Sequence, residues 1–285
     1  MGRELVSLMP PGLVIYVINL DRSQDRWLAM VARLEALGLV AIRMSAVDAK
    51  SEVDEMRRRR GFPAPDGDRI FQMNAEGRRY LIGEEACFQS HLKAQALFLQ
   101  TDETLALILE DDADMAPDFA ETISAIAAAA PLWDAVRLES AGRRGTRRAL
   151  KIADLPGGRM LVGSLRPCSG SSGYLITRPG AERFIAAAKG VFEPVDTYLS
   201  SVGKHGLRML DCAPSPLRQS GAASVIHAER DAGVTTPTRR APGLVARWRR
   251  LKADLKRVLP RRRLFARAYK DRNLGWIEAP WNRDW

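Results

Sequence analysis

The chain has 285 residues, a length typical of one large domain or two small ones. Hydrophobic residues make up 46% and charged residues 27%, which excludes collagen-like, low-complexity and disulfide-scaffold classes, so we expect a folded globular protein. The apolar run from Leu13 to Ile18 is shorter than the roughly 20 residues that cross a bilayer, and no signal peptide is expected. Three cysteines without CxxC spacing favour a reducing compartment, so we expect a cytoplasmic protein.

The net charge of +10 is concentrated near the C-terminus, where residues 239–272 hold 14 Lys or Arg against two acids. In this segment apolar residues recur at spacings of three and four, which predicts an amphipathic helix with a basic face that ends at Pro260. The apolar residues are Leu244, Trp248, Leu251, Leu255, Val258 and Leu259. We expect residues 243–263 to lie on an anionic membrane surface, and the alternative is a helix packed back on the domain. Nucleic acid is disfavoured as a partner, because no zinc-finger spacing or RNA-binding aromatic signature accompanies the charge.

Strand and helix patterns alternate from residue 13 to residue 188. Continuous apolar or β-rich runs predict strands over 13–19, 39–44, 105–109, 134–138 and 174–177. Helical spacing predicts helices over 27–37, 84–100, 117–130 and 179–188, while residues 51–80 are expected to form a loop or short helices. The first strand, helix and second strand fit a βαβ unit. This alternation predicts an α/β fold with a mostly parallel central sheet flanked by helices.

Three consecutive carboxylates, Glu110, Asp111 and Asp112, follow the strand over 105–109. They stand where α/β sheets bind ligands, and three adjacent negative charges in a folded protein call for water or a divalent cation between them. Mg²⁺ and Mn²⁺ use one or two protein carboxylates and fill their other positions with water and phosphate oxygens, so we expect a ligand that carries phosphate. The alternative is that one acid caps the helix beginning at Pro117 and the others are solvated.

Several sequence blocks occur together in a fixed order. They are VIYVINLDRSQDR at 14–26, AVD at 46–48, GEEACFQSHLKA at 83–94, ALILEDDA at 106–113, SSGYLITRPGAERFI at 171–185 and PVD at 194–196. In these blocks the chain resembles glycosyltransferase family 25, the lipopolysaccharide or lipooligosaccharide core glycosyltransferases, over about residues 13–226. We therefore expect a catalytic domain over 1–231 and a basic amphipathic extension over 232–285.

The resemblance implies a GT-A-like nucleotide-binding fold and an inverting transfer from a UDP-sugar that depends on Mn²⁺ or Mg²⁺. Galactose is the favoured sugar and glucose the alternative. The acceptor is expected to be a lipid-linked surface saccharide at the inner face of the cytoplasmic membrane, where the enzyme is peripheral. The basic segment would then hold the enzyme near its acceptor.

The resemblance also implies roles for single residues. Metal ligands are expected at Asp111, Asp112 and His227. The donor-binding set is Asn19, Leu20, Asp21, Arg22, Arg26, Asp48, Ser90, His91 and Gln219. Asp196 is the expected general base and Glu110 its rival, and the alternative for Asp196 is to cap the helix that follows it. His91 is otherwise a satisfied core side chain, and Cys87 is expected to pack as a small hydrophobe.

Two other functions remain open from the residues. Carboxylates at the end of a parallel strand also serve metal-dependent phosphotransfer or phosphohydrolase enzymes. A non-catalytic sugar-binding or membrane-binding relative would keep the fold without turnover. The ordered blocks favour the transferase over the first, and the intact acids at 110–112 and 196 favour it over the second.

Overall fold

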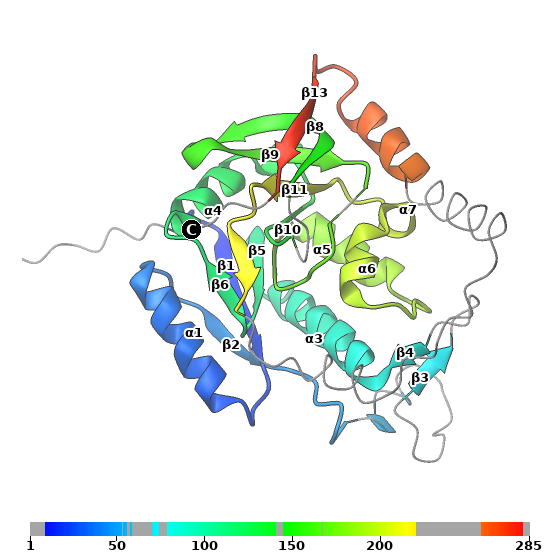
Figure 1. Ribbon diagram of the computed structural model, residues 1–285. Helices are drawn as coiled ribbons and strands as arrows, with labels where there is room; N and C mark the ends of the chain where they lie inside the picture. The colour runs from blue at the N-terminus through cyan, green and yellow to red at the C-terminus, as the bar shows by residue number, and fades with distance from the viewer. Residues whose placement is uncertain are drawn as a thin grey trace, which may run out of the picture.

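The computed structural model describes residues 9–52, 54–55, 58, 70–73, 79–140, 145–166, 168–220 and 258–281. Their main feature is a nine-stranded sheet with the order β13-β8-β9-β11-β7-β10-β5-β1-β2 (Figure 1). Two small sheets, β12-β6 and β3-β4, accompany it. The strands are β1 (Leu13–Asn19), β2 (Ile42–Ser45), β3 (Ile70–Met73), β4 (Arg79–Leu81), β5 (Leu105–Glu110), β6 (Ala113–Met115), β7 (Ala135–Arg137), β8 (Thr146–Leu155), β9 (Arg159–Ser164), β10 (Gly173–Thr177), β11 (Met209–Ala213), β12 (Leu217–Gln219) and β13 (Trp276–Pro280).

Helices cover both faces of the large sheet, as Figure 1 shows. The α-helices are α1 (Gln24–Ala36), α3 (Ile82–Phe98), α4 (Phe119–Ala128), α5 (Arg178–Ala187), α6 (Val195–Ser200) and α7 (Val202–His205), with short 3₁₀ helices η1 (Ala130–Leu132) and η2 (Pro156–Gly158). Residues 258–268 are also helical. The predicted α/β class with helices flanking the sheet is confirmed.

The sheet is mixed, so the expectation of a mostly parallel sheet is wrong. Strands β5, β1 and β2 are parallel to one another, as are β7 and β11. The other neighbours are antiparallel, because β10 is inserted in reverse between β5 and β7, and because β13, β8 and β9 pair antiparallel with one another and β9 with β11 at one edge. The pattern of β8 did not predict a strand, because its exposed and buried residues lack a continuous apolar run.

Strand β1 shows why the central strands are apolar throughout. Side chains alternate between the two faces of a pleated strand. Ile15 and Val17 pack on the side of α1 and α4, whereas Tyr16 and Ile18 pack on the side of α3, α5 and α6. Both faces are covered, so each residue of the run has an apolar environment.

The βαβ unit is confirmed and brings three strand ends together. Helix α1 buries Met30 and Leu34 at i, i+4 spacing against the sheet, and its chain turns at Gly38, whose φ is +67°. Strand β2 then returns parallel to β1, with Asn19 opposite Ser45. Because β5 is parallel to β1 on its other side, the carboxyl ends of β1, β2 and β5 meet at one edge of the sheet.

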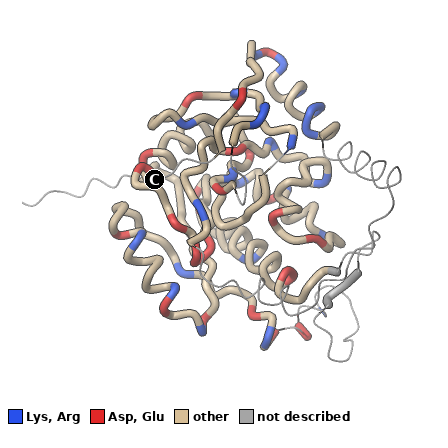
Figure 2. The backbone as a smooth tube through the Cα atoms, in the orientation of Figure 1, with Lys and Arg blue, Asp and Glu red and all other residues tan. Residues whose placement is uncertain are grey.

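The C-terminal residues 258–281 pack on the domain. Strand β13 pairs with β8, and the helix over 258–268 buries Arg261 and Phe265 at its inner side, followed by Tyr269. Pro260 lies within this helix, so the expectation that the helix ends there is wrong. Figure 2 shows Lys and Arg along the same helix. Residues 243–257 and the boundary at 231/232 lie outside the described residues.

Among the described helices none is long and apolar enough to cross a membrane.

Candidate active site

A pocket with a volume of about 130 Å³, open to solvent, lies at the edge where β1, β2 and β5 end. It is lined by the end of β1, the loop after β2, one face of α3 and the turn after β5. The residues predicted for the site that line it are Leu20, Arg22, Arg26, Asp48, Ser90, His91, Glu110, Asp111 and Asp112. The fold therefore brings together residues from four separate sequence blocks.

Asp111 and Asp112 form the turn between β5 and β6. The sequence did not predict strand β6, which pairs with β12 and holds the turn. Asn19 donates a 2.6 Å hydrogen bond from Nδ2 to Oδ2 of Asp111, and Arg26 forms an ion pair with Oδ1 at 3.1 Å. Both oxygens of Asp111 are thus engaged. In contrast, the buried Oδ1 of Asp112 has no hydrogen-bond partner among the described residues.

The electrostatics of this turn favour a cation. Burial raises the pKa of Asp112 to about 7, with further contributions from the negative charges of Glu110, Asp111 and Glu139 that Arg26 partly opposes. Burial also raises the pKa of Asp111. Carboxylate oxygens are the ligands of Mg²⁺ and Mn²⁺, and the unpartnered oxygen of Asp112 is a free ligand atom, so this donor set fits a hard divalent cation. The third expected ligand, His227, lies outside the described residues.

Glu110 ends β5 and points into the pocket. Burial alone would raise its pKa, but hydrogen bonds to Oε1 from His91 at 3.3 Å and from Ser171 at 2.7 Å, with the charge of Arg26, hold that pKa below its usual value. Glu110 is therefore an ionised acceptor at neutral pH.

A buried chain of hydrogen bonds orients His91. Gln95 Nε2 donates to the hydroxyl of Tyr174 at 3.0 Å, and that hydroxyl lies 3.2 Å from His91 Nδ1. When the Tyr174 hydroxyl donates its hydrogen bond to Nδ1, the proton of the neutral imidazole lies on Nε2, which then donates to Glu110. The two rings also stack, with centroids 5.6 Å apart. His91 is fully buried, as expected of a core side chain, yet its ring edge lines the pocket.

Two further contacts set the walls of the pocket. Ser90 donates to the Ala86 carbonyl at 2.7 Å and accepts from the Val47 amide at 2.9 Å, which ties the loop after β2 to α3. Arg22 and Asp48 form an ion pair between the loops after β1 and β2. Ser90 therefore holds the loop after β2 against α3. Arg22 and Asp48 are charged residues of the pocket lining.

Other predicted residues lie outside the pocket lining. Asn19 is buried behind Asp111, and Asp21 bonds to Ser45 at 2.8 Å with a side chain that is 68% exposed. Gln219 donates to Ser172 at 3.0 Å. Asp196 lies in the first turn of α6 and accepts from its neighbour's amide at 2.7 Å. Burial raises the pKa of Cys87, and the charge of Asp196 is one of the smaller contributions to that rise.

The alternative role of Asp196, to stabilise the start of α6, agrees with its hydrogen bond to a first-turn amide, although Asp196 is not the cap residue itself. The cap position of α6 is occupied by Pro194, which makes no side-chain cap bond, whereas the Asp196 carboxylate accepts from the Thr197 amide in the first turn. Asp196 is half-buried and lies in the first turn of the helix, where its negative charge is favourable.

Sequence reasoning missed Glu139, which lies just beyond β7. It is 3% exposed, and burial together with the charge of Glu110 raises its pKa to about 7 although the Ser172 amide donates to it at 2.9 Å. Gly170 passes so close that an added Cβ would lie 2.4 Å from a Glu139 oxygen, and its φ is +113°. In the sequence, the Gly-Ser-Ser-Gly run at 170–173 indicates the loop that packs against Glu139.

Comparisons with known proteins indicate the family of the chain. The family model described as "Glycosyltransferase family 25 (LPS biosynthesis protein)" matches residues 13–155. An Anopheles gambiae protein named "Glycosyltransferase 25 family member" is 28% identical over 192 residues, which is 65% of this chain and 31% of that protein. The chain thus matches about a third of that relative's length. The family match spans half of the chain and includes β1, the βαβ unit and the acidic turn, and so the chain belongs to glycosyltransferase family 25.

Proposed function

We propose that this protein transfers a hexose from a UDP-sugar to a hydroxyl group of a saccharide, with inversion at the anomeric carbon. Galactose is the favoured sugar and glucose the alternative. One observation carries the proposal: the pocket at the carboxyl ends of β1, β2 and β5 combines two arginines, Arg22 and Arg26, with the carboxylates of Asp111 and Asp112. Family membership supports the transferase class.

The pocket has the chemistry that a nucleotide diphosphate requires. The guanidinium groups of Arg22 and Arg26 are suited to phosphate oxygens, which they bond in a fixed planar geometry. Apolar side chains of Ile18, Leu20 and Val47 offer a surface for the base. Asp48 lies beside them and is a suitable acceptor for a ribose hydroxyl or a base N–H.

Asp111 and Asp112 would hold Mn²⁺ or Mg²⁺, with His227 as a proposed third ligand. Such an ion supplies stabilisation of the charge that develops on the leaving diphosphate. The unpartnered oxygen of Asp112 supports this assignment. Asn19 and Arg26 keep the Asp111 carboxylate oriented toward the same edge.

Inverting transfer needs a base that takes the proton of the acceptor hydroxyl on the face opposite the leaving group. We propose Asp196 for this role, because it is half-buried and lies on a different element from the metal-binding turn. Glu110 is the rival: it lines the pocket and is ionised, but His91 and Ser171 already donate to one of its oxygens.

The acceptor is proposed to be a lipid-linked saccharide, such as a growing lipopolysaccharide, at the cytoplasmic face of the inner membrane. The words "LPS biosynthesis protein" in the family description support this choice. Arg261 is buried, so within 243–263 the proposed contacts with anionic lipid belong to residues 243–257 and to the exposed Arg262 and Arg263.

Calorimetric titration of UDP, UDP-galactose and UDP-glucose, each with Mn²⁺, with Mg²⁺ and with chelator, tests the proposal. We expect binding of UDP that depends on the cation and is tightest for UDP-galactose. Absence of UDP binding under every condition contradicts the proposal and favours a non-catalytic relative. Release of phosphate from phosphate esters without sugar transfer would favour the phosphohydrolase.

A further inference from the structure

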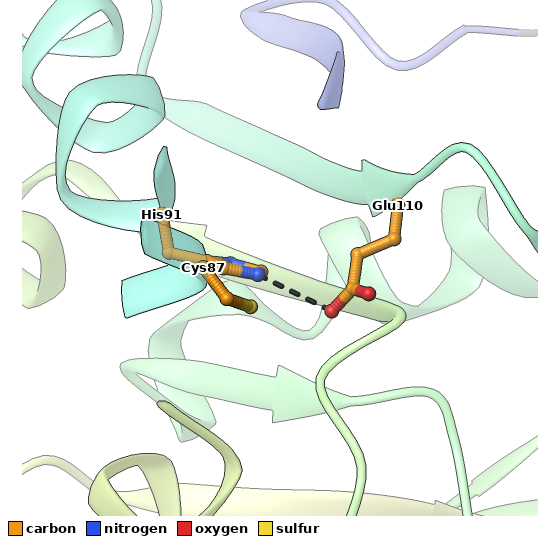
Figure 3. Close-up of side chains that lie close together, drawn as sticks. All are labelled: Cys87, His91 and Glu110. Carbon is orange, nitrogen blue, oxygen red and sulfur yellow. Dashed lines mark hydrogen bonds and ion pairs between the residues drawn. The ribbon is translucent and has the colours of Figure 1, made fainter. Parts of the chain in front are cut away.

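Three side chains of metal-ligating types are among those that line the pocket, and Figure 3 shows them close together. Cys87 and His91 lie four residues apart on α3 and so project from the same face of the helix, and Glu110 reaches them from the end of β5. The Cys87 Sγ atom, a ring nitrogen of His91 and a Glu110 oxygen lie within 4.8 Å of one another. None of the proposed steps of sugar transfer uses this combination.

We propose that Cys87, His91 and Glu110 form a binding site for a borderline-soft divalent cation, with Zn²⁺ as the expected ion. The site is separate from the hard-cation site at Asp111 and Asp112. Thiolate and imidazole ligands select zinc over Mg²⁺ and Mn²⁺, which prefer oxygen. This inference does not rest on the proposed glycosyltransferase function.

The geometry needs little adjustment to hold such an ion. Ligand atoms around a tetrahedral zinc lie ~3.5 Å apart, since Zn–N and Zn–O bonds are about 2.0 Å and Zn–S bonds about 2.3 Å long. His91 Nε2 and Glu110 Oε1 are already 3.3 Å apart. Cys87 closes the remaining gap by rotation of its side chain, and the thiol proton leaves to solvent as the sulfur binds. The three protein ligands leave a fourth position that opens into the pocket.

The hydrogen-bond chain behind His91 suits a metal ligand. A histidine bound through Nε2 carries its proton on Nδ1 and donates it to a second group. Tyr174 is that group here, because its hydroxyl lies 3.2 Å from Nδ1. Tyr174 then needs an acceptor for its own proton. The buried Oε1 of Gln95 has no partner among the described residues, and rotating this amide by half a turn brings Oε1 to the tyrosine hydroxyl.

The surrounding charges favour a cation. Burial, and after it the charges of Glu110, Asp196 and Asp112, raise the pKa of the Cys87 thiol. A divalent ion at the sulfur removes this repulsion and lets the thiolate form beside them.

Co²⁺ provides a spectroscopic test on the full chain. The protein is stripped with chelator, supplied with excess Mg²⁺ to fill the hard-cation site, and titrated with Co²⁺. We expect the visible bands of tetrahedral cobalt and a near-ultraviolet charge-transfer band from the thiolate, and one equivalent of Zn²⁺ should abolish both. A cobalt complex without the thiolate band overturns the proposal.

Matched variants assign the ligands. Cys87→Ala should abolish the thiolate band, whereas Cys168→Ala and Cys212→Ala, which remove buried free thiols elsewhere, should retain it. His91→Gln should lower the affinity for Zn²⁺ at least ~10-fold, and Tyr174→Phe, acting through His91, by about 10-fold. Asp112→Asn should leave the band in place. A band that persists in Cys87→Ala, or that is lost in Asp112→Asn, contradicts a separate site.

Discussion

Asn19 and Asp111, which are 92 residues apart, are joined by a 2.6 Å hydrogen bond between the end of β1 and the turn after β5. Arg26 holds the other oxygen of the same carboxylate at 3.1 Å. The two adjacent aspartates are therefore unequal: Asp111 is oriented by protein groups, while Asp112 keeps a buried oxygen without a partner among the described residues. A cation would complete the coordination of the second carboxylate without disturbing the first.

Asp112→Asn should remove the dependence of UDP binding on a divalent cation. The amide keeps the size of the side chain but loses the charge, so we expect sugar transfer to fall by roughly 10²-fold or more, as for other groups that stabilise charge in the transition state. Calorimetry and a transfer assay measure the two effects. Asp114→Asn is the matched control, because Asp114 pairs with Arg218 outside the pocket lining. Transfer at the wild-type rate in Asp112→Asn would contradict the metal assignment.

Asp196→Asn and Glu110→Gln separate the two candidates for the general base. Loss of the base should lower kcat by about 10²-fold with little change in the affinity for the UDP-sugar. We expect this result for Asp196→Asn. Glu110→Gln should instead weaken donor binding, because it alters the hydrogen bonds of His91 and Ser171 at the pocket floor. The reverse pattern would assign the base to Glu110.

The acidic turn makes stability depend on pH when no cation is bound. Burial and neighbouring carboxylates raise the pKa of Asp112 from 3.8 to about 7, so between these values the folded protein binds more protons than the unfolded chain. Stability therefore falls as pH rises through this window, and the loss from Asp112 is roughly 1 to 4 kcal/mol at pH 8. Urea unfolding in chelator at pH 5 and pH 8 measures it. Asp112→Asn should reduce the difference in the free energy of unfolding between pH 5 and pH 8. An unchanged difference would refute the assignment.

Arg261→Ala tests the packing of the C-terminal helix. The guanidinium is fully buried and donates to the Ser164 carbonyl at 3.0 Å and to the Ser200 carbonyl at 3.2 Å. Removing it leaves two carbonyls without these donors and opens a cavity, so we expect a loss of about 2 to 4 kcal/mol in the free energy of unfolding. Arg262→Ala, one residue along and exposed, should stay within about 0.5 kcal/mol. Equal effects of the two variants would mean that Arg261 does not stabilise the fold.

The proposed contact with membranes is tested in the full chain, because deleting the C-terminal segment would also remove β13 and Arg261 from the core. Changing Arg247, Arg249 and Arg250 to Gln should weaken binding to vesicles with anionic lipid by roughly 100-fold, at ~1 kcal/mol for each charge. Co-sedimentation with anionic and with neutral vesicles measures it. Binding that the triple variant retains would exclude this segment as the membrane contact.

Local pattern in the sequence was sufficient for the central part of the fold. The apolar runs of β1 and β5 are buried on both faces, so their strands are readable without knowing their neighbours. Helical spacing gave α1, α3 and α5 to within a few residues, and the acidic turn could be placed at the end of β5 because it follows that run directly. The ordered blocks gave the family for the same reason: they lie within single elements and the loops next to them.

The features of the fold and of the site that the sequence did not predict depend on residues that are far apart in the chain. The sequence alone determined the α/β class, the βαβ unit, the family and most of the residues that line the pocket. Only the tertiary structure decided the mixed sheet, the burial of Glu139 and Arg261, and the meeting of Cys87, His91 and Glu110. Strand direction, burial of a charge and the distance between ligands are set by packing between separate elements, and no local spacing of residue types encodes them.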